Sequence, residues 1–322
     1  MTQRLVLLGS AAQGYDDVIR RHLATAWDIG LVDDRDAGGR LTEADVVVSM
    51  SLNACHGSAP RLKLIQVPGA GYDGIDFSAV PPGAVVCNVF EHEVGCAEYA
   101  MLGMLEWSIR LGRADAELRA GNWSRSSRFG GPPSGELRDR TVAIVGLGRI
   151  GREVARRARA FGMAVQAANR TVRDPGPDVY RLVGLNELAS VAAQADFLVV
   201  SCALTSETRG LIDDKVLASM RPSAVVINVA RGPVMDEEAL WSALSEKRIG
   251  GAVLDVWWQN PPDLAKPTAP SRFPFATLPN VLMSPHIAGW TTGTVARRGR
   301  FMAENIERVA RGEEPLNIVR PS

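Results

Sequence analysis

Short apolar runs rich in β-branched residues alternate with longer segments of helical pattern along almost the whole chain. The candidate strands are Arg4–Leu8, Asp45–Ser49, Lys63–Val67, Ala84–Cys87, Thr141–Val145, Ala164–Ala168, Phe197–Ser201, Ala224–Val229, Gly251–Asp255 and Val281–Met283. Continuous apolar runs are typical of strands that are covered on both faces. Strands that alternate with helices predict right-handed βαβ units, so we expect an α/β protein built from doubly wound parallel sheets.

Three segments between these strands indicate the domain organisation. A long helical pattern, Ala97–Arg119, is followed by Gly121–Pro133, which is rich in Gly, Ser and Pro and is interpreted as a linker or a surface loop. The segment Gln259–Pro274 contains five prolines and cannot form regular structure. A chain of 322 residues exceeds the roughly 100–200 residues of one typical domain, so we expect two domains.

Composition and charge exclude several classes of protein. Lys plus Arg and Asp plus Glu balance at 36 each, so no overall field favours nucleic acid or an anionic membrane. The local cluster Arg297, Arg298 and Arg300 is interpreted as a solvated helix face. The four cysteines have no metal-ligand spacing, and no run approaches the ~18 apolar residues of a membrane span. We therefore expect a soluble, cytoplasmic protein without a metal site.

The motif GLGRIG, residues 146–151, lies between an apolar strand and a helical pattern. This is the context in which such a loop binds a dinucleotide. The first glycine permits a tight turn, the second lets the backbone approach a pyrophosphate, and the third lets helix and strand pack closely. The N-terminus of the helix offers unpaired N–H groups to the anion. The candidate cofactor-binding residues of this loop are Gly146, Gly148, Arg149, Ile150 and Gly151.

The end of the next strand indicates which dinucleotide is bound. An NAD site usually has an acidic residue about 20 positions on, where it accepts from the ribose 2′-hydroxyl. This chain has Asn169-Arg170-Thr171 there, and its first carboxylate is Asp174. An arginine flanked by an amide and a hydroxyl suits a 2′-phosphate. We predict a preference for NADP, with NAD as a possible cofactor.

Three further polar residues follow buried strands. Arg231 comes after the strand Ala224–Val229, Asp255 ends the strand Gly251–Asp255, and His286 follows the last candidate strand. Ligands of doubly wound sheets bind beyond the carboxyl ends of the strands, where all three residues are expected.

Together with the glycine loop, these stretches resemble the D-isomer-specific 2-hydroxyacid dehydrogenase family. Further matches are Gln66–Asp76 (QVPGAGYDGID), Ala97-Glu98 and Leu204–Ile212 (LTSETRGLI), so the resemblance covers the chain from about Leu62 to Val319. The family implies a flavodoxin-like substrate-binding domain and a Rossmann cofactor domain. We expect residues 1–99 and 287–322 in the first and residues 100–286 in the second.

The resemblance assigns a role to each matching residue. Arg231 would bind the carboxylate and carbonyl of the substrate, and His286 would be the acid/base for the substrate oxygen. The backbone N–H groups of Ala70 and Gly71 would hold the carboxylate. Asp255 would contact the nicotinamide side of the cofactor, or would only cap the following turn. Further cofactor contacts are assigned to Ala230.

The chain departs from the family pattern at Asn260, where relatives have a Glu that supports the catalytic histidine. An amide can orient the imidazole but cannot supply the charge that favours its protonated form. Formate dehydrogenases of the same superfamily also have an amide here, so formate oxidation is one alternative. A catalytically idle, cofactor-binding regulatory relative is another.

The resemblance implies an oxidoreductase that transfers a hydride between NADP(H) and a small 2-keto or 2-hydroxy acid, of the glyoxylate/hydroxypyruvate reductase type. It also implies a homodimer formed through the cofactor domain, and closure of the two domains over the substrate. Trp257, Trp258, Trp290 and His92 are near the candidate site in sequence, and either a pocket for a larger substrate or a packing role fits them.

Overall fold

The computed structural model describes residues 2–261 and 267–320, which form two compact units. The first unit consists of Met1–Glu91 and Thr291–Ser322, and the second of His92–Trp290. The second unit begins at His92 rather than at residue 100 because helix α3 (Glu93–Ile109) packs along α5 (Arg149–Ala160) of that unit. The part of Gln259–Pro274 at residues 262–266 lies outside the described residues.

The first unit is built around a six-stranded sheet of order β13-β5-β4-β3-β1-β2. All neighbouring strands are parallel except β13, which is antiparallel to β5. Its strands are β1 (Gln3–Leu8), β2 (Trp27–Val32), β3 (Val46–Val48), β4 (Leu64–Gln66), β5 (Val85–Cys87) and β13 (Ile318–Val319). Its helices are α1 (Ser10–Gln13), α2 (Asp16–His22) and the long α9 (Thr292–Ala310).

The second unit contains a seven-stranded parallel sheet of order β12-β11-β10-β9-β6-β7-β8. Its strands are β6 (Thr141–Val145), β7 (Ala164–Asn169), β8 (Arg181–Gly184), β9 (Phe197–Val200), β10 (Val225–Asn228), β11 (Gly251–Leu254) and β12 (Val281–Met283). Its helices are α3, α4 (Leu111–Arg119), α5, α6 (Leu188–Ala192), α7 (Asp214–Ser219) and α8 (Glu237–Ser245).

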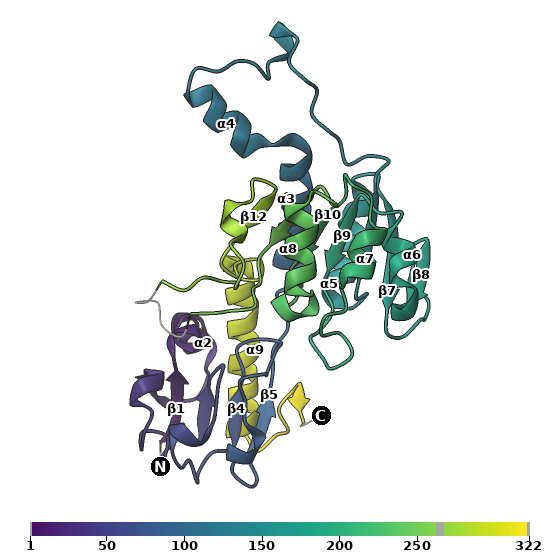
Figure 1. The fold of residues 1–322 in the computed structure, drawn as a ribbon. Helices are drawn as coiled ribbons and strands as arrows, with labels where there is room; N and C mark the ends of the chain where they lie inside the picture. Colours follow the sequence, from purple (N-terminus) through teal and green to yellow (C-terminus); the bar gives the residue numbers. More distant parts are fainter. Residues whose placement is uncertain (1, 262–266, 321–322) are drawn as a thin grey trace. The chain divides into compact units, whose positions relative to one another are not determined.

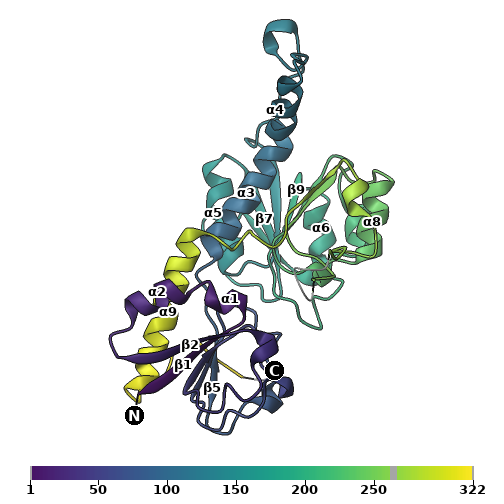
Figure 2. The same ribbon diagram turned by 90° about the vertical axis from the view of Figure 1, so that its left-hand side faces the viewer.

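Helices cover both faces of the second sheet (Figures 1 and 2). Successive residues of one strand point to opposite faces: Ile144 packs in the core under α3 and α5, whereas Ala143 and Val145 pack in the core under α6, α7 and α8. The first sheet is divided in the same way between two buried clusters. The predicted fold class, two doubly wound α/β domains, is therefore confirmed.

Every predicted strand is present, but three others, β2, β8 and β13, were not predicted. All three are at sheet edges, and in β2 and β8 half-exposed positions break up the apolar run; β2, for example, has only Val32 buried. The third unpredicted strand, β13, has two residues, which is too short for a recognisable pattern. Within the described residues, no helix is both long enough and apolar enough to cross a membrane.

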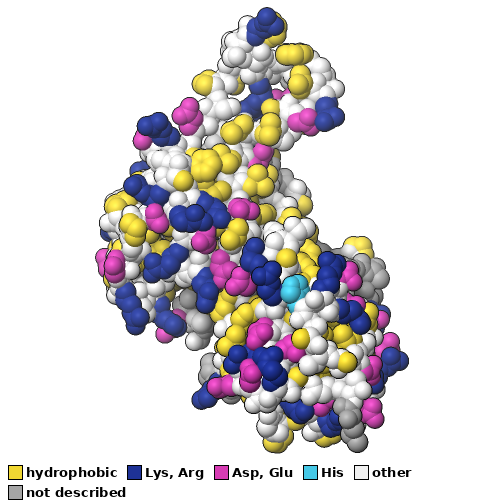
Figure 3. Space-filling model, turned by 180° about the vertical axis from the view of Figure 1, so that it is seen from behind, with side chains coloured by type: hydrophobic (Ala, Val, Ile, Leu, Met, Phe, Trp, Pro, Cys, Tyr) yellow, Lys and Arg dark blue, Asp and Glu magenta, His cyan; other side chains and the backbone are white. Residues whose placement is uncertain are grey.

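The predicted helix Ala97–Arg119 is two helices, separated by Arg110 in the left-handed conformation with φ 58°. The guanidinium of Arg110 lies 3.6 Å from the centroid of the Trp107 ring, a cation–π contact that stabilises the bend. Beyond the bend, α4 and the following loop form a projecting arm, residues 111–135. Hydrophobic side chains are exposed along the arm and the adjoining end of α3 (Figure 3).

The expectation for one member of the arginine cluster was wrong. Arg298 is only 9% exposed, and its guanidinium donates to the carbonyl oxygens of Phe90 (2.7 Å) and Pro68 (3.2 Å). Arg300, two residues on, is exposed as expected. Because residues two apart point to different sides of a helix, α9 presents Arg298 to the unit's core and Arg300 to solvent.

Replacing Arg298 by Met should therefore leave two backbone carbonyls without their charged donor. We expect Arg298→Met to lower the free energy of unfolding by about 2–3 kcal/mol, measured by urea denaturation. The matched control Arg300→Met should change it by less than about 0.5 kcal/mol. Equal effects of the two variants would show that the buried contacts of Arg298 contribute nothing.

Candidate active site

The polar residues selected from the sequence follow the strands of the second sheet at one edge. Asn169 ends β7, Arg231 follows β10, Asp255 follows β11 and His286 follows β12. Strands β10, β11 and β12 are adjacent and parallel, so the loops that carry Arg231, Asp255 and His286 emerge next to one another. The tertiary structure therefore brings together residues that are far apart in the sequence.

The glycine loop has the geometry that close approach of an anion requires. Gly146 has φ 94°, and a Cβ added there would lie 2.7 Å from the backbone of Cys202. At Gly151 an added Cβ would lie 2.2 Å from the carbonyl oxygen of Gly146. Gly148, by contrast, faces open space, since an added Cβ would meet no atom within 4 Å.

Gly148 is also the N-cap of α5, and no side chain caps that end of the helix. This end of the helix thus lies beside open space, as a pyrophosphate site requires. The residues of this loop fit a dinucleotide.

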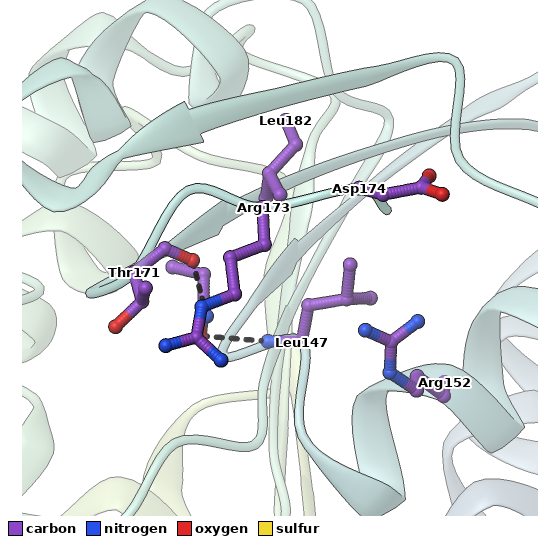
Figure 4. A pocket seen from close by; sticks show the side chains of 7 residues that line it. Leu147, Arg152, Thr171, Arg173, Asp174 and Leu182 are labelled. Atoms are coloured by element: carbon purple, nitrogen blue, oxygen red, sulfur yellow. Dashed lines mark hydrogen bonds between the residues drawn. The ribbon is translucent and has the colours of Figure 1, made fainter. Parts of the chain in front are cut away.

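Asn169 shapes this loop from the neighbouring strand. Its side-chain oxygen accepts from the backbone N–H of Leu147 at 3.1 Å, and its amide nitrogen donates to the carbonyl oxygen of Thr171 at 2.9 Å. Asn169 and Thr171 also line a pocket of about 210 Å³ at this end of the sheet (Figure 4). The complete lining consists of Leu147, Arg152, Asn169, Thr171, Arg173, Asp174 and Leu182.

Two arginines line this pocket, Arg152 and Arg173, and neither is the one selected from the sequence. Arg170 lies 3.9 Å from Glu207, and both side chains are largely exposed. Arg173 lines the pocket, with its guanidinium beside Thr171 and Leu147, whereas the carboxylate of Asp174 points away from it (Figure 4). The Arg173 side chain forms no ion pair or hydrogen bond with any described residue. The sequence indicated only that Arg173 is close to Arg170. The path of the loop after β7 decides which of these two arginines lines the pocket.

The turn that carries Arg231 is held by a buried amide. Asn228, the last residue of β10, is 0% exposed; its side-chain oxygen accepts from Ala230 N–H and its nitrogen donates to the carbonyl oxygen of Arg231. One guanidinium nitrogen of Arg231 donates to the carbonyl oxygen of Ala230 at 2.8 Å. A fixed turn of this kind presents a guanidinium in a defined direction.

The carboxylate of Asp255 is 1% exposed and is bonded to its own chain. It accepts from Ser284 Oγ at 2.6 Å and from the backbone N–H groups of Ile287 and Ala288, each at 2.8 Å. Its carbonyl oxygen accepts from His286 N–H at 2.8 Å. These bonds favour the capping role for Asp255. The side chain of His286 is exposed, on a backbone with φ 59°.

Asn260 is exposed at the surface, whereas Trp257 and Trp258 pack against the core of the second unit. The side chain of Asn260 is exposed and forms no hydrogen bond within residues 2–261 and 267–320. Trp257 donates to the carbonyl oxygen of Ser284 at 2.9 Å, and Trp258 stacks on Phe275 with 5.6 Å between ring centroids. Both tryptophans pack against the core under α8, which favours the packing role for them.

The first unit carries the loop of Ala70 and Gly71, which follows β4. Three carbonyl oxygens of this loop accept hydrogen bonds from within the unit. The donor to Pro68 is the Arg298 guanidinium, the donor to Gly69 is Val89 N–H, and the donor to Ala70 is the side chain of Asn88. The N–H groups of Ala70 and Gly71 donate to no acceptor among the described residues. Two adjacent free N–H groups are suited to bind an anion.

A doubly wound sheet with an open glycine loop beyond its strand ends is typical of a dinucleotide-binding domain. The comparison with known families agrees, because residues 101–288 match the family described as "D-isomer specific 2-hydroxyacid dehydrogenase, NAD binding domain". The chain belongs to this family.

Individual relatives include enzymes with different substrates. The chain is 32% identical to a glyoxylate reductase of Thermococcus gammatolerans over 87% of its own length and 84% of the relative's. It is 34% identical to a D-3-phosphoglycerate dehydrogenase of Methanocaldococcus jannaschii over 81% of its length, but it spans only 48% of that relative.

A solved structure also resembles the whole chain. The NADPH-dependent glyoxylate/hydroxypyruvate reductase of Sinorhizobium meliloti, in complex with NADP and malonate, is 29% identical, with a TM-score of 0.81 and 100% of each chain covered.

Two glycines of the loop provide a matched pair of variants. Gly148→Ala adds a methyl group to open space on a backbone with φ −85°, so we expect normal thermal stability but at least tenfold weaker dinucleotide binding. Gly146→Ala meets the backbone of Cys202 at a positive φ, so we expect a loss of stability itself. Thermal unfolding and fluorescence titration with NADPH measure the two effects. Unchanged NADPH binding by Gly148→Ala would contradict the assignment of the loop.

Proposed function

We propose that this protein reduces a small 2-keto acid to the D-2-hydroxy acid with NADPH. The observation that carries the proposal is the placement of Arg231 and His286 at one edge of the sheet, on the loops after β10 and β12, with only β11 between these strands; the glycine loop of the same sheet is open to a pyrophosphate. The similarity to glyoxylate and glyoxylate/hydroxypyruvate reductases supports a substrate of two or three carbons.

Each residue has a defined task in the proposed reaction. Arg231 forms charge-assisted hydrogen bonds to the substrate carboxylate and polarises the keto group. The nicotinamide, when bound, supplies the hydride to the keto carbon. The imidazolium of His286 gives its proton to the keto oxygen, and in the reverse direction the neutral imidazole takes that proton back.

We assign the preference for NADP to arginines at the end of β7. Arg173 lines the pocket beside the glycine loop, and Arg152 from α5 lines the same pocket. Arg170, the residue first selected, is on the same turn and adds positive charge. A 2′-phosphate is dianionic at neutral pH and suits two guanidinium groups, while Asn169 has no charge that would repel it.

Removing Arg173 should therefore weaken the enzyme's use of NADPH selectively. We expect Arg173→Ala to raise the KM for NADPH about tenfold, the equivalent of one charge-assisted hydrogen bond, and to leave the KM for NADH within twofold. Arg156→Ala, an exposed arginine of α5, is the matched control and should change neither. Equal changes for both cofactors would refute the role of Arg173.

A substrate panel tests the reaction itself. Glyoxylate, hydroxypyruvate and phenylpyruvate are each assayed with NADPH and NADH, and formate with both oxidised cofactors. Turnover of a keto acid that yields the D-product supports the proposal. Oxidation of formate would support the alternative suggested by the amide of Asn260. Tight cofactor binding without any turnover would instead support a regulatory relative.

We also propose that the protein is a homodimer that pairs through the projecting arm of residues 111–135. Helix α4 has no buried residue in the described chain, and a nine-residue helix is not stable by itself in water. The arm nevertheless exposes Leu111 (64%), Leu118 (49%), Trp123 (57%) and Phe129 (70%), side chains that a second copy would cover.

Charged substitutions on this arm should separate the copies. We expect Leu118→Asp combined with Trp123→Asp to convert a dimer into a monomer, measured by sedimentation velocity. Tyr180→Asp, an exposed aromatic residue outside the arm, should leave the mass unchanged. A monomeric unmodified protein, or a dimer that survives both substitutions, would contradict this interface.

A further inference from the structure

His286 is held in a backbone conformation that it would not adopt by itself. Its φ is 59°, in the left-handed region, which non-glycine residues rarely adopt. Such a conformation persists only when the surrounding structure holds it in place. The residues that do so determine where the imidazole is presented.

The carbonyl oxygen and the carboxylate of Asp255 accept hydrogen bonds from the backbone of His286 and of the two residues that follow it. His286 N–H donates to the Asp255 carbonyl oxygen, while Ile287 N–H and Ala288 N–H donate to the two carboxylate oxygens. Three successive N–H groups therefore converge on one buried residue. The position of that carboxylate sets the position of the loop.

The carboxylate is itself fixed by a hydroxyl relay from α3. Ser284 Oγ donates to Asp255 Oδ1 at 2.6 Å, and the Tyr99 hydroxyl lies 2.5 Å from Ser284 Oγ. Because a serine hydroxyl has one proton and Ser284 gives it to the carboxylate, the Tyr99 hydroxyl must be the donor to Ser284.

The environment of Tyr99 keeps its proton in place. Burial raises the pKa of the Tyr99 hydroxyl, the bond to Ser284 opposes this, and the nearby charge of Asp255 raises it further. Over the pH range in which a histidine titrates, Tyr99 therefore donates to Ser284 and Ser284 donates to Asp255.

We propose that Tyr99 and Ser284 are positioning residues of the reaction, which hold the Asp255 carboxylate and through it the loop that presents His286. This inference rests on the proposed function, in which His286 transfers the proton. Neither hydroxyl has to contact the substrate. Ser284 is also held independently, since its carbonyl oxygen accepts from the indole of Trp257 and its N–H donates to the carbonyl oxygen of Leu254.

Removing one hydroxyl at a time tests the relay in the full chain. We expect Tyr99→Phe to lower kcat about tenfold with hydroxypyruvate or glyoxylate, because a small displacement of an acid/base group slows proton transfer. The KM for NADPH and the melting temperature should stay close to those of the unmodified enzyme. Tyr180→Phe, which removes an exposed hydroxyl from the same unit, is the matched control and should leave kcat unchanged.

The second hydroxyl shows whether the two act in series. Ser284→Ala should lower kcat at least as much as Tyr99→Phe, and Ser284→Thr, which keeps the hydroxyl, should restore most of the activity. In the double variant the Tyr99 substitution should add almost nothing to the loss, because the link to Asp255 is already broken. Losses that multiply would mean that the two residues act independently, and would overturn the relay.

Hydrogen–deuterium exchange provides a readout that does not depend on catalysis. In Tyr99→Phe and Ser284→Ala, the N–H groups of Ile287 and Ala288 should exchange faster, with no change in the strands of the sheet. Unaltered exchange at these two sites would refute the relay, whatever the substrate. If the unmodified enzyme turns over no keto acid, the proposed function fails, and exchange alone then decides whether Tyr99 and Ser284 hold the loop.

Discussion

The second unit depends on the hydrogen bonding of its buried parallel sheet. Strands covered on both faces pair their backbone groups within the sheet and carry mostly apolar side chains, with the buried Gln166 of β7 as an exception. Because the strands are parallel, their carboxyl ends lie at one edge. The glycine loop, Arg231, Asp255 and His286 are all at this edge for the same reason. The packing of the apolar strands therefore determines where these polar residues lie.

The strand ends share a device that shapes the loops beyond them. Asn169, Asn228 and Asp255 each come at or just after the end of a strand, and each uses its side chain to bind backbone N–H groups of a turn. Asn169 shapes the glycine loop, Asn228 the turn of Arg231, and Asp255 the loop of His286. Short polar side chains are suited to this task because they imitate a backbone carbonyl. The three loops that carry candidate site residues are thus held in shape by side chains at the ends of strands.

Positive charge in this protein has two separate uses. In the first unit Arg298 is buried and binds carbonyl oxygens, so its charge stabilises the loop of Ala70 and Gly71. In the second unit Arg173 lines a pocket and has no partner among the described residues. The composition has equal numbers of acidic and basic residues, and it therefore does not reveal either environment. Their difference comes from burial, which decides whether a guanidinium is part of the structure or available to a ligand.

The sequence by itself determined the alternation of strands and helices, the doubly wound class and the family, because uninterrupted apolar runs and the GLGRIG motif are local patterns. It did not predict β2 and β8, whose edge positions leave the apolar run broken. Only the tertiary structure decided that Arg173 lines the pocket and that Tyr99, Ser284 and Asp255 form one chain of hydrogen bonds. The physical reason is that these contacts join segments far apart along the chain, and a local pattern carries no record of which distant side chains the packed sheet brings within hydrogen-bonding distance.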